Sequence, residues 1–126
     1  MYIVTGGTQG IGAATVEKLA SQGHLVVFTG RDLKAGEQLA SSLAGCTFVP
    51  GDVLSESDCT TVVATAMKLS DGKLSGLVNN AGMSGRKVFT DTTAQEWDTL
   101  FAVNTRSAFF YTKHALPGLI LSLIHI

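Results

Sequence analysis

A glycine-rich turn between the first apolar run and the first helical stretch constrains the fold of this chain more than any other feature. Residues 5–12 have the sequence Thr-Gly-Gly-Thr-Gln-Gly-Ile-Gly. They follow the apolar segment 2–5 and lead into the segment 10–21, whose apolar residues recur at helical spacing. A chain that passes this tightly from a strand into a helix needs positions without a Cβ atom. The pattern therefore predicts a strand, a glycine turn and a helix at the start of the chain.

The same alternation of short and long apolar patterns continues along the sequence. Further strands are expected at 25–29, 47–49 and 74–79, and further helices at 33–43, from Ser55 onward, and from the capping box Thr93-x-x-Glu96 to Pro117. The inward face of the last helix is expected to include Trp97, Leu100, Phe101 and Ala108. Strands that alternate with helices over short connections predict an α/β fold. We expect a Rossmann-like, doubly wound parallel sheet in strand order 3-2-1-4, truncated after the fourth strand and the helix that follows it.

Composition narrows the functional classes. The chain has 126 residues, enough for one domain, and 45 % of them are apolar. A net charge of −1 and a pI near 6.2 argue against a nucleic-acid partner. The longest apolar stretch, 116–126, is too short to span a membrane as a helix, and the N-terminus does not resemble a signal peptide. We expect a cytoplasmic protein whose two cysteines, Cys46 and Cys59, are reduced and bind no metal.

The glycine turn has a direct chemical use. A pyrophosphate placed against it meets free backbone N–H groups and the positive end of the helix dipole. No Gly-Lys-Ser/Thr sequence follows the turn, so it is not a P-loop for nucleoside triphosphates. A tight turn without a ligand remains the alternative at this point.

Three motifs then point to one family. The glycine turn, Asn-Asn-Ala-Gly at 79–82 and Val-Asn-Thr-Arg-Ser-Ala-Phe-Phe at 103–110 resemble, in order and spacing, the shorter form of the short-chain dehydrogenase/reductase family. The likeness covers about residues 1–120. It implies that these residues are the N-terminal part of a single NAD(P)-binding Rossmann domain. It also implies an oxidoreductase that transfers hydride between a nicotinamide cofactor and a carbonyl or alcohol substrate.

The resemblance assigns roles to individual positions. The residues that would line the cofactor pyrophosphate are Gly6, Thr8, Gln9, Gly10, Ile11 and Gly12. Asp52 would contact the adenine amino group with Val53 beside it, and Asn79, Ala81 and Gly82 would pass along the adenosine ribose. Asn104 would be the family's catalytic asparagine. The residues alone leave alternatives open, because Asp52 could simply form the turn after Pro50-Gly51. Asn104, on a face shared with apolar residues, is expected to be a buried carboxamide that needs partners, or else a structural cap or kink.

The end of the second strand bears on the choice of coenzyme. A carboxylate there usually selects NAD, whereas an arginine accommodates the 2′-phosphate of NADP. Here Gly30 occupies the position of the acid, Arg31 follows it, and Asp32 is a plausible N-cap of the next helix. We therefore favour NADP over NAD.

The family's proton-transfer residues have no counterpart in the sequence. Tyrosines occur only at 2 and 111, and the residue four positions after Tyr111 is Ala115 rather than a lysine. Lys113 lies two positions after Tyr111, on a different face of a helix. We expect the chain to carry the cofactor-binding half without the Ser/Tyr/Lys catalytic part, and to be inactive alone. The alternative is a non-catalytic dinucleotide-binding module; the motifs disfavour a sugar-nucleotide epimerase.

Two expectations concern the longer protein. The last six residues, 121–126, resemble the translation of a sequencing-adapter end, so we expect them to be a non-native tail; the alternative is a genuine apolar terminus that packs on the sheet. The family resemblance also implies a homotetrameric parent protein.

Overall fold

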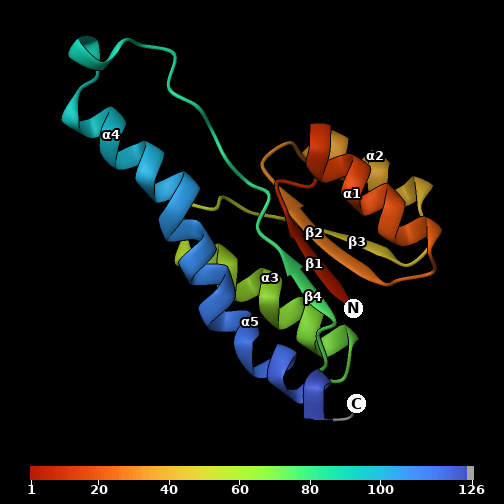
Figure 1. Ribbon diagram of the computed structural model, residues 1–126. Coiled ribbons are helices and arrows are strands. Elements are labelled where there is room, and N and C mark those ends of the chain that lie inside the picture. Colours follow the sequence, from red (N-terminus) through yellow and green to blue (C-terminus); the bar gives the residue numbers. More distant parts are fainter. Residues whose placement is uncertain (125–126) are drawn as a thin grey trace.

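A four-stranded parallel sheet forms the centre of the computed structural model, which describes residues 1–124 (Figure 1). Its strands are β1 (Tyr2–Thr5), β2 (Val26–Gly30), β3 (Cys46–Pro50) and β4 (Gly76–Val78). Their order is β3-β2-β1-β4, with Val4 of β1 opposite Phe28 of β2 and Val78 of β4. The predicted Rossmann-like fold and strand order are thus confirmed.

Helices cover both faces of this sheet. One face carries α1 (Gly10–Ser21) and α2 (Leu33–Ser42), and the other carries α3 (Glu56–Leu69) and α5 (Ser107–Ile124). A 3-10 turn, η1 (Phe89–Asp91), precedes α4 (Ala94–Phe101), and the π-helical turn η2 (Ala102–Arg106) joins α4 to α5. Figure 1 shows α4 and α5 as one long rod that extends past the carboxyl ends of the strands. No helix among residues 1–124 is both long enough and apolar enough to cross a membrane.

Alternate strand residues supply two separate cores. Ile3 and Val27 point to the side of α3 and α5, where they pack with Val62. Val4 and Phe28 point to the side of α1 and pack with Val16. Because both faces of β1 and β2 are buried, these strands are continuously apolar rather than alternating. That is why their sequence predicted a doubly covered sheet.

Side-chain caps fix the starts of three helices as the sequence predicted. Asp32 accepts a hydrogen bond from the backbone N–H of Ala35 at 2.9 Å and so caps α2. Ser55 caps α3, and Thr93 with Glu96 forms both hydrogen bonds of the predicted capping box at α4. Each of these hydrogen bonds joins residues within one short segment, so the sequence of that segment is enough to predict it.

The prediction that Pro117 ends the last helix is wrong. Pro117 lies inside α5, which continues to Ile124. A proline in a helix removes one N–H donor and costs about 3 kcal/mol. Tertiary contacts around it offset that cost, because the backbone N–H of Leu74 donates to the Gly118 carbonyl at 3.1 Å and Ala115 is buried in the core. Residues 121–124 belong to this helix, residues 125–126 lie outside the described residues, and the expected non-native origin of 121–126 stays a prediction.

The predicted inward face of the long helix is also partly wrong. Trp97 and Phe101 are 51 % and 50 % exposed, and their rings stack on each other with centroids 4.8 Å apart. Leu100 and Ala108 are half-buried. Trp97 and Phe101 lie on α4, which extends past the carboxyl ends of the strands, so the sheet does not cover them (Figure 1). The helical spacing identified a stripe of apolar residues, but it did not show whether another part of the chain packs against that stripe.

Two hydroxyls are buried between the sheet and α5. Tyr111 and Thr29 have no exposed surface, and among the described residues the two hydroxyls have only a weak contact with each other, which falls short of hydrogen-bond geometry. Burial, with a smaller contribution from Cys59, raises the pKa of Tyr111 above its usual range. An unpaired buried hydroxyl costs free energy that a methyl group or ring hydrogen of the same shape does not.

Replacing Tyr111 by phenylalanine is therefore expected to leave stability unchanged or to raise it by up to about 1 kcal/mol. The ring and its packing remain, and only the unpaired hydroxyl is lost. Urea unfolding of both proteins, followed by circular dichroism, measures the difference. A loss of more than about 1 kcal/mol would show that the hydroxyl is hydrogen-bonded in solution.

Cys59 makes stability depend on alkaline pH. Burial, reinforced by the negative charge of Glu56, raises the pKa of its thiol to about 11. The folded protein then holds this proton more tightly than the unfolded chain, in which a cysteine titrates near pH 8.5. The contribution to stability is complete below about pH 8.5 and is lost as the pH rises toward 11. We expect the urea midpoint of wild type to fall over this range more steeply than that of Cys59→Ala; parallel pH profiles would contradict the assignment.

Candidate functional site

A cleft of about 670 Å³ opens at the carboxyl ends of the strands. It is lined by the glycine turn and by segments that follow β2, β3 and β4: residues 6, 8–12, 30–32, 51–54 and 80–83, with Thr99 and Val103 from the long helix. The cleft therefore collects eleven of the predicted cofactor-binding residues: Gly6, Thr8, Gln9, Gly10, Ile11, Gly12, Arg31, Asp52, Val53, Ala81 and Gly82. Ligands in open α/β sheets bind at this end of the strands.

Close backbone approach shapes the glycine turn. Gly6 has φ +64°, a conformation that residues with a Cβ rarely adopt. A Cβ atom on Gly12 would overlap the carbonyl oxygen of Gly6. The turn can therefore fold back against the first turn of α1 only because Gly12 has no side chain.

Two polar side chains tie the glycine turn to the end of β4. The Thr5 hydroxyl oxygen accepts hydrogen bonds from the backbone N–H groups of Asn80, at 3.1 Å, and Ala81, at 3.0 Å. The Asn80 carboxamide donates in return to the carbonyl oxygens of Thr5, at 3.0 Å, and Gly6, at 3.1 Å. Four hydrogen bonds thus hold together segments that are about 75 residues apart in the sequence. Thr5 is buried, so the loss of its hydroxyl would leave N–H donors unpaired.

The start of α1 offers hydrogen-bond donors to the cleft. Gln9 is the N-cap residue, but its side chain makes no capping hydrogen bond, and the first turn of α1 contains no acidic residue. The N–H groups of that turn and the positive end of the helix dipole are consequently available to an anion. Ile11, 81 % exposed on α1, lines the same cleft instead of packing in the core.

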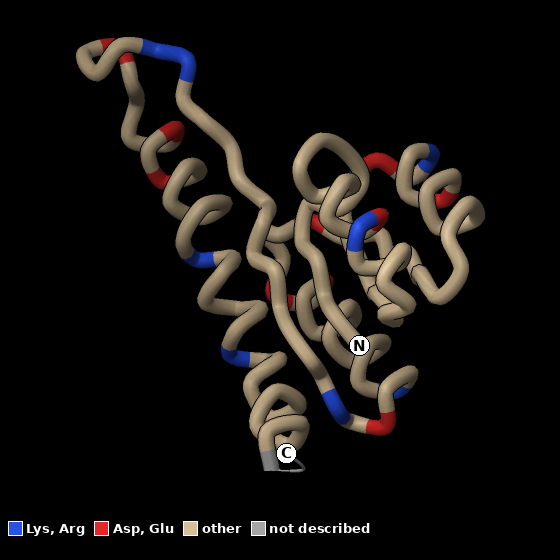
Figure 2. Tube along the Cα trace, turned by 45° about the vertical axis from the view of Figure 1, so that its right-hand side comes forward, with Lys and Arg blue, Asp and Glu red and all other residues tan. Residues whose placement is uncertain are grey.

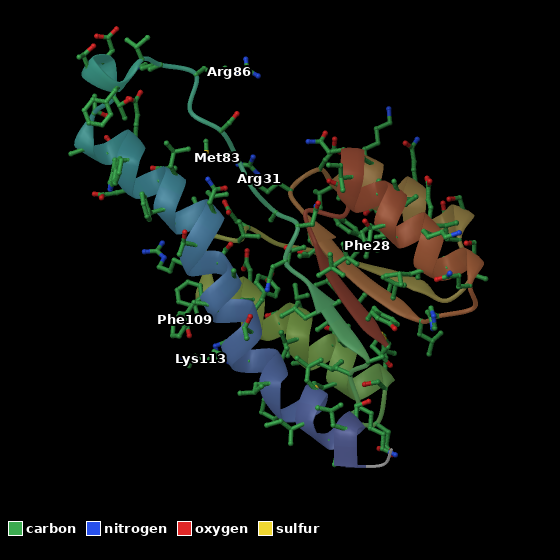
Figure 3. All side chains as sticks on the ribbon, viewed as in Figure 1. Phe28, Arg31, Met83, Arg86, Phe109 and Lys113 are labelled. Carbon is green, nitrogen blue, oxygen red and sulfur yellow. The ribbon has the colours of Figure 1, made fainter. Side chains whose placement is uncertain are left out.

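Arg31 lines the cleft in the turn after β2. It is exposed and takes part in no salt bridge among residues 1–124, and Figure 3 shows it on the side of the cleft toward Met83. Its neighbour Asp32 is committed to capping α2. Figure 2 shows charges of both signs spread over the whole chain, so Arg31 is a local feature and not part of a basic face.

Asp52 and Val53 line the cleft in the turn after β3. One carboxylate oxygen of Asp52 accepts a hydrogen bond from the backbone N–H of Leu54 at 2.9 Å. This is the turn-forming geometry that the sequence left open as an alternative role, and it leaves the other carboxylate oxygen for a ligand.

Asn79 and Asn104 do not line the cleft. The side chain of Asn79 donates to the Thr112 hydroxyl at 3.3 Å, on α5. Asn104 lies in the π-helical turn, where its carboxamide accepts from the Met83 N–H at 2.8 Å and donates to the Met83 carbonyl at 2.7 Å. The expectation that Asn104 is buried is wrong, since the residue is exposed. The oxygen and the NH₂ group of its carboxamide each make one hydrogen bond that holds the strand-end loop to the helix.

Sequence reasoning missed Thr5 as a site residue and did not single out Asn80 within the segment 79–82, which it expected to steady the fourth strand. Both lie inside motifs that it identified, the Thr-Gly start of the glycine turn and the Asn-Asn-Ala-Gly segment. A polar side chain next to each glycine motif was the available signal. The pairing itself is non-local, so nothing in either segment alone specifies it.

A second, smaller hollow of about 380 Å³ lies between the loop 83–87 and α4. Lys87 and Glu96 form an ion pair of 2.6 Å there, which lowers the pKa of Glu96. Both side chains are substantially exposed, so the pair contributes little to stability. Residues 1–124 contain no cluster of histidine, cysteine, aspartate and glutamate side chains that could hold a metal ion.

Comparison with known proteins places this site in a family. The family model described as short chain dehydrogenase matches residues 1–122. The chain belongs to the short-chain dehydrogenase family. An NADP-dependent (R)-specific alcohol dehydrogenase from Lentilactobacillus kefiri is 40 % identical over 114 residues, which are 88 % of this chain and 45 % of that relative.

Solved structures of short-chain dehydrogenases share the fold. A glucose/ribitol dehydrogenase of this family from Brucella melitensis superposes with a TM-score of 0.88 at 30 % identity, over 94 % of this chain and 51 % of that one. An NADPH-bound carbonyl reductase from chicken fatty liver superposes with a TM-score of 0.84 at 26 % identity, over 92 % and 50 %. The chain thus spans about half the length of the relatives that it matches.

The Thr5–Asn80 network gives a direct test of how the site is held. Thr5→Val keeps the side-chain volume but removes the acceptor for two backbone N–H groups, and we expect a loss of about 2 kcal/mol. Thr15→Val is the matched control, because the Thr15 hydroxyl bonds only to the Ile11 carbonyl within α1, and it should cost less than about 0.5 kcal/mol. Urea unfolding measures both; equal losses would contradict a special role for Thr5.

Proposed function

We propose that this chain binds a nicotinamide dinucleotide, with NADP favoured over NAD, as the cofactor-binding half of an oxidoreductase. In this proposal the full-length parent moves hydride between the cofactor and a carbonyl or alcohol carbon. The observation that carries it is the cleft, in which the glycine turn, Arg31 and the turn after β3 face one space. Membership of the short-chain dehydrogenase family supports the reaction class.

The pyrophosphate has a fitting position at the glycine turn. The absence of a Cβ atom at Gly12 leaves the backbone folded tightly against α1, and the N–H groups at the start of α1 have no side-chain cap. Backbone N–H groups of this kind, together with the helix dipole, bind phosphate oxygens. Ile11 would cover the ligand with an apolar surface, which accounts for its exposure in the cleft.

A separate set of residues would contact the adenosine half of the cofactor. Asp52 and Val53 lie in the turn after β3, and Ala81 and Gly82 follow β4. We propose that the free carboxylate oxygen of Asp52 accepts from the adenine amino group. Asn79 stays a proposed ribose contact through its backbone, since its side chain is bonded to Thr112.

Steric crowding disfavours an acid at the NAD-selecting position. A Cβ on Gly30 would lie 2.6 Å from the Thr8 methyl carbon and 2.8 Å from its hydroxyl oxygen, closer than real Cβ atoms approach. Asp32 is occupied as the cap of α2, whereas Arg31 is free to offer its guanidinium to phosphate oxygens. The similar alcohol dehydrogenase is NADP-dependent, and the similar carbonyl reductase binds NADPH, which also favours NADP here.

Asn104 would act by holding the loop after β4 beside the reaction space. Both polar groups of its carboxamide engage the Met83 backbone, and Met83 lines the cleft. When bound, the cofactor would supply or accept the hydride. Tyr111 cannot serve as the proton donor, because it is fully buried and its pKa is raised by that burial. We therefore expect the chain by itself to bind the cofactor without turnover.

The coenzyme preference is tested by Arg31→Ala. Loss of a charge-assisted hydrogen bond to the 2′-phosphate costs about 1.5–3 kcal/mol, which corresponds to a tenfold or greater rise in the Kd for NADPH. The Kd for NADH should change by less than about twofold, because that coenzyme has no 2′-phosphate. Titration calorimetry with both coenzymes measures the two values.

Arg86→Ala is the matched control for this measurement. Arg86 is an exposed arginine outside the cleft, and Figure 3 shows it projecting from the loop before α4. It should leave both affinities unchanged. Equal weakening of NADPH and NADH by Arg31→Ala would overturn the assignment to NADP, and no binding of either coenzyme by wild type would overturn the proposed function.

A further inference from the structure

The turn that joins β3 to α3 is held by one hydrogen bond to the end of β2 and by two within the turn itself. The Gly51 N–H donates to the Gly30 carbonyl at 3.1 Å, and the Ser55 N–H donates to the Asp52 carbonyl at 2.9 Å. The Asp52 carboxylate accepts from Leu54. One further side chain ties the turn directly to the first turn of α3.

Asp58 provides that side chain. One of its carboxylate oxygens accepts a hydrogen bond from the Asp52 N–H at 2.8 Å, six residues back along the chain. Its own N–H donates to the Ser55 hydroxyl, which caps α3. In a regular capping box, such as that of Glu96 and Thr93, the acidic side chain bonds to the N–H of the cap residue itself. Asp58 instead reaches past Ser55 to the residue that lines the cleft.

Packing beneath the turn leaves it little room to shift. A Cβ on Gly51 would lie 2.9 Å from the Thr29 hydroxyl oxygen and 3.3 Å from the Asp58 Cβ. The turn therefore packs against β2 and against the first turn of α3. Asp58 itself is half-buried, so its carboxylate is partly shielded from water and its hydrogen bond is stronger than an exposed one.

We infer that Asp58 is a positioning residue for the adenine side of the cleft. Its carboxylate fixes the Asp52 backbone, and through it the direction in which the Asp52 side chain and Val53 face the ligand. The inference rests on the proposed binding of a nicotinamide dinucleotide. Asp58 touches no ligand in this account, since only residues 51–54 of this segment line the cleft.

The test compares Asp58→Ala with Asp58→Asn in the full chain. Asp58→Ala removes the acceptor, and we expect the Kd for NADPH to rise about tenfold by titration calorimetry. Asp58→Asn keeps an oxygen that can accept from the Asp52 N–H, so its Kd should stay within about threefold of wild type. Adenosine 2′,5′-bisphosphate, which carries the adenosine half without nicotinamide, should show the same loss with Asp58→Ala.

Ser55→Ala separates positioning from general stability. It removes the cap of the same helix, with a cost of about 1 kcal/mol, but leaves the bond between Asp52 and Asp58 intact. Its melting temperature should fall, while its Kd for NADPH stays within about threefold of wild type. Amide hydrogen exchange at Asp52 should accelerate in Asp58→Ala more than in Ser55→Ala.

The other possible results would each contradict either this inference or the proposed function. Wild-type affinity in Asp58→Ala, or an equal loss of affinity in Ser55→Ala, would overturn the inference while the proposed function stands. Asp58→Ser, whose shorter polar side chain does not reach the Asp52 N–H, replaces the alanine variant if that variant does not fold, with the same expected tenfold loss. Failure of wild type to bind NADPH, NADH or adenosine 2′,5′-bisphosphate would overturn the proposed function, and this inference with it.

Discussion

The reciprocal hydrogen bonding of Thr5 and Asn80 is the interaction on which the site depends. It joins the ends of β1 and β4, the two neighbouring strands between which the glycine turn and the Asn-Asn-Ala-Gly segment diverge. Backbone carbonyls at a turn this tight would otherwise lack partners, and buried polar groups without partners are costly. With those carbonyls satisfied by Asn80, the N–H groups at the start of α1 remain directed at the cleft. The same network therefore stabilises the fold and leaves donors for a ligand.

The rest of the cleft follows from the parallel sheet. Parallel strands end at one edge, so the turns after β1, β2, β3 and β4 meet there even though they are widely spaced in sequence. These turns contribute different chemical groups: backbone donors after β1, the Arg31 guanidinium after β2, and the Asp52 carboxylate after β3. The long helix closes the remaining side through Thr99 and Val103. An elongated anionic ligand with distinct ends suits this division better than a small compact one.

Local patterns were enough to predict most of the fold. The continuous apolar runs of β1 and β2, the glycine turn and the caps at Asp32, Ser55 and Thr93 each reflect interactions within a few residues. The sequence-based predictions were wrong where contacts between segments distant in the sequence determine the structure. Pro117 is tolerated because the surrounding helix packs on Leu74, and Trp97 and Phe101 are exposed because α4 extends past the carboxyl ends of the strands, where the sheet does not cover it. In the cleft, residue types could be predicted from motifs, but the engagement of Asn104 with Met83 and of Asp58 with Asp52 could not, since side-chain direction depends on the assembled backbone.

The exposed ring of Trp97 has a practical consequence. It is the only tryptophan in the sequence, and it stacks on Phe101 along the outer side of α4, outside the set of residues that line the cleft. Its emission spectrum reports the polarity around that helix and is free of overlapping signals from other indoles. This chain thus contains a built-in optical probe of whether the surface around α4 is exposed to water or covered.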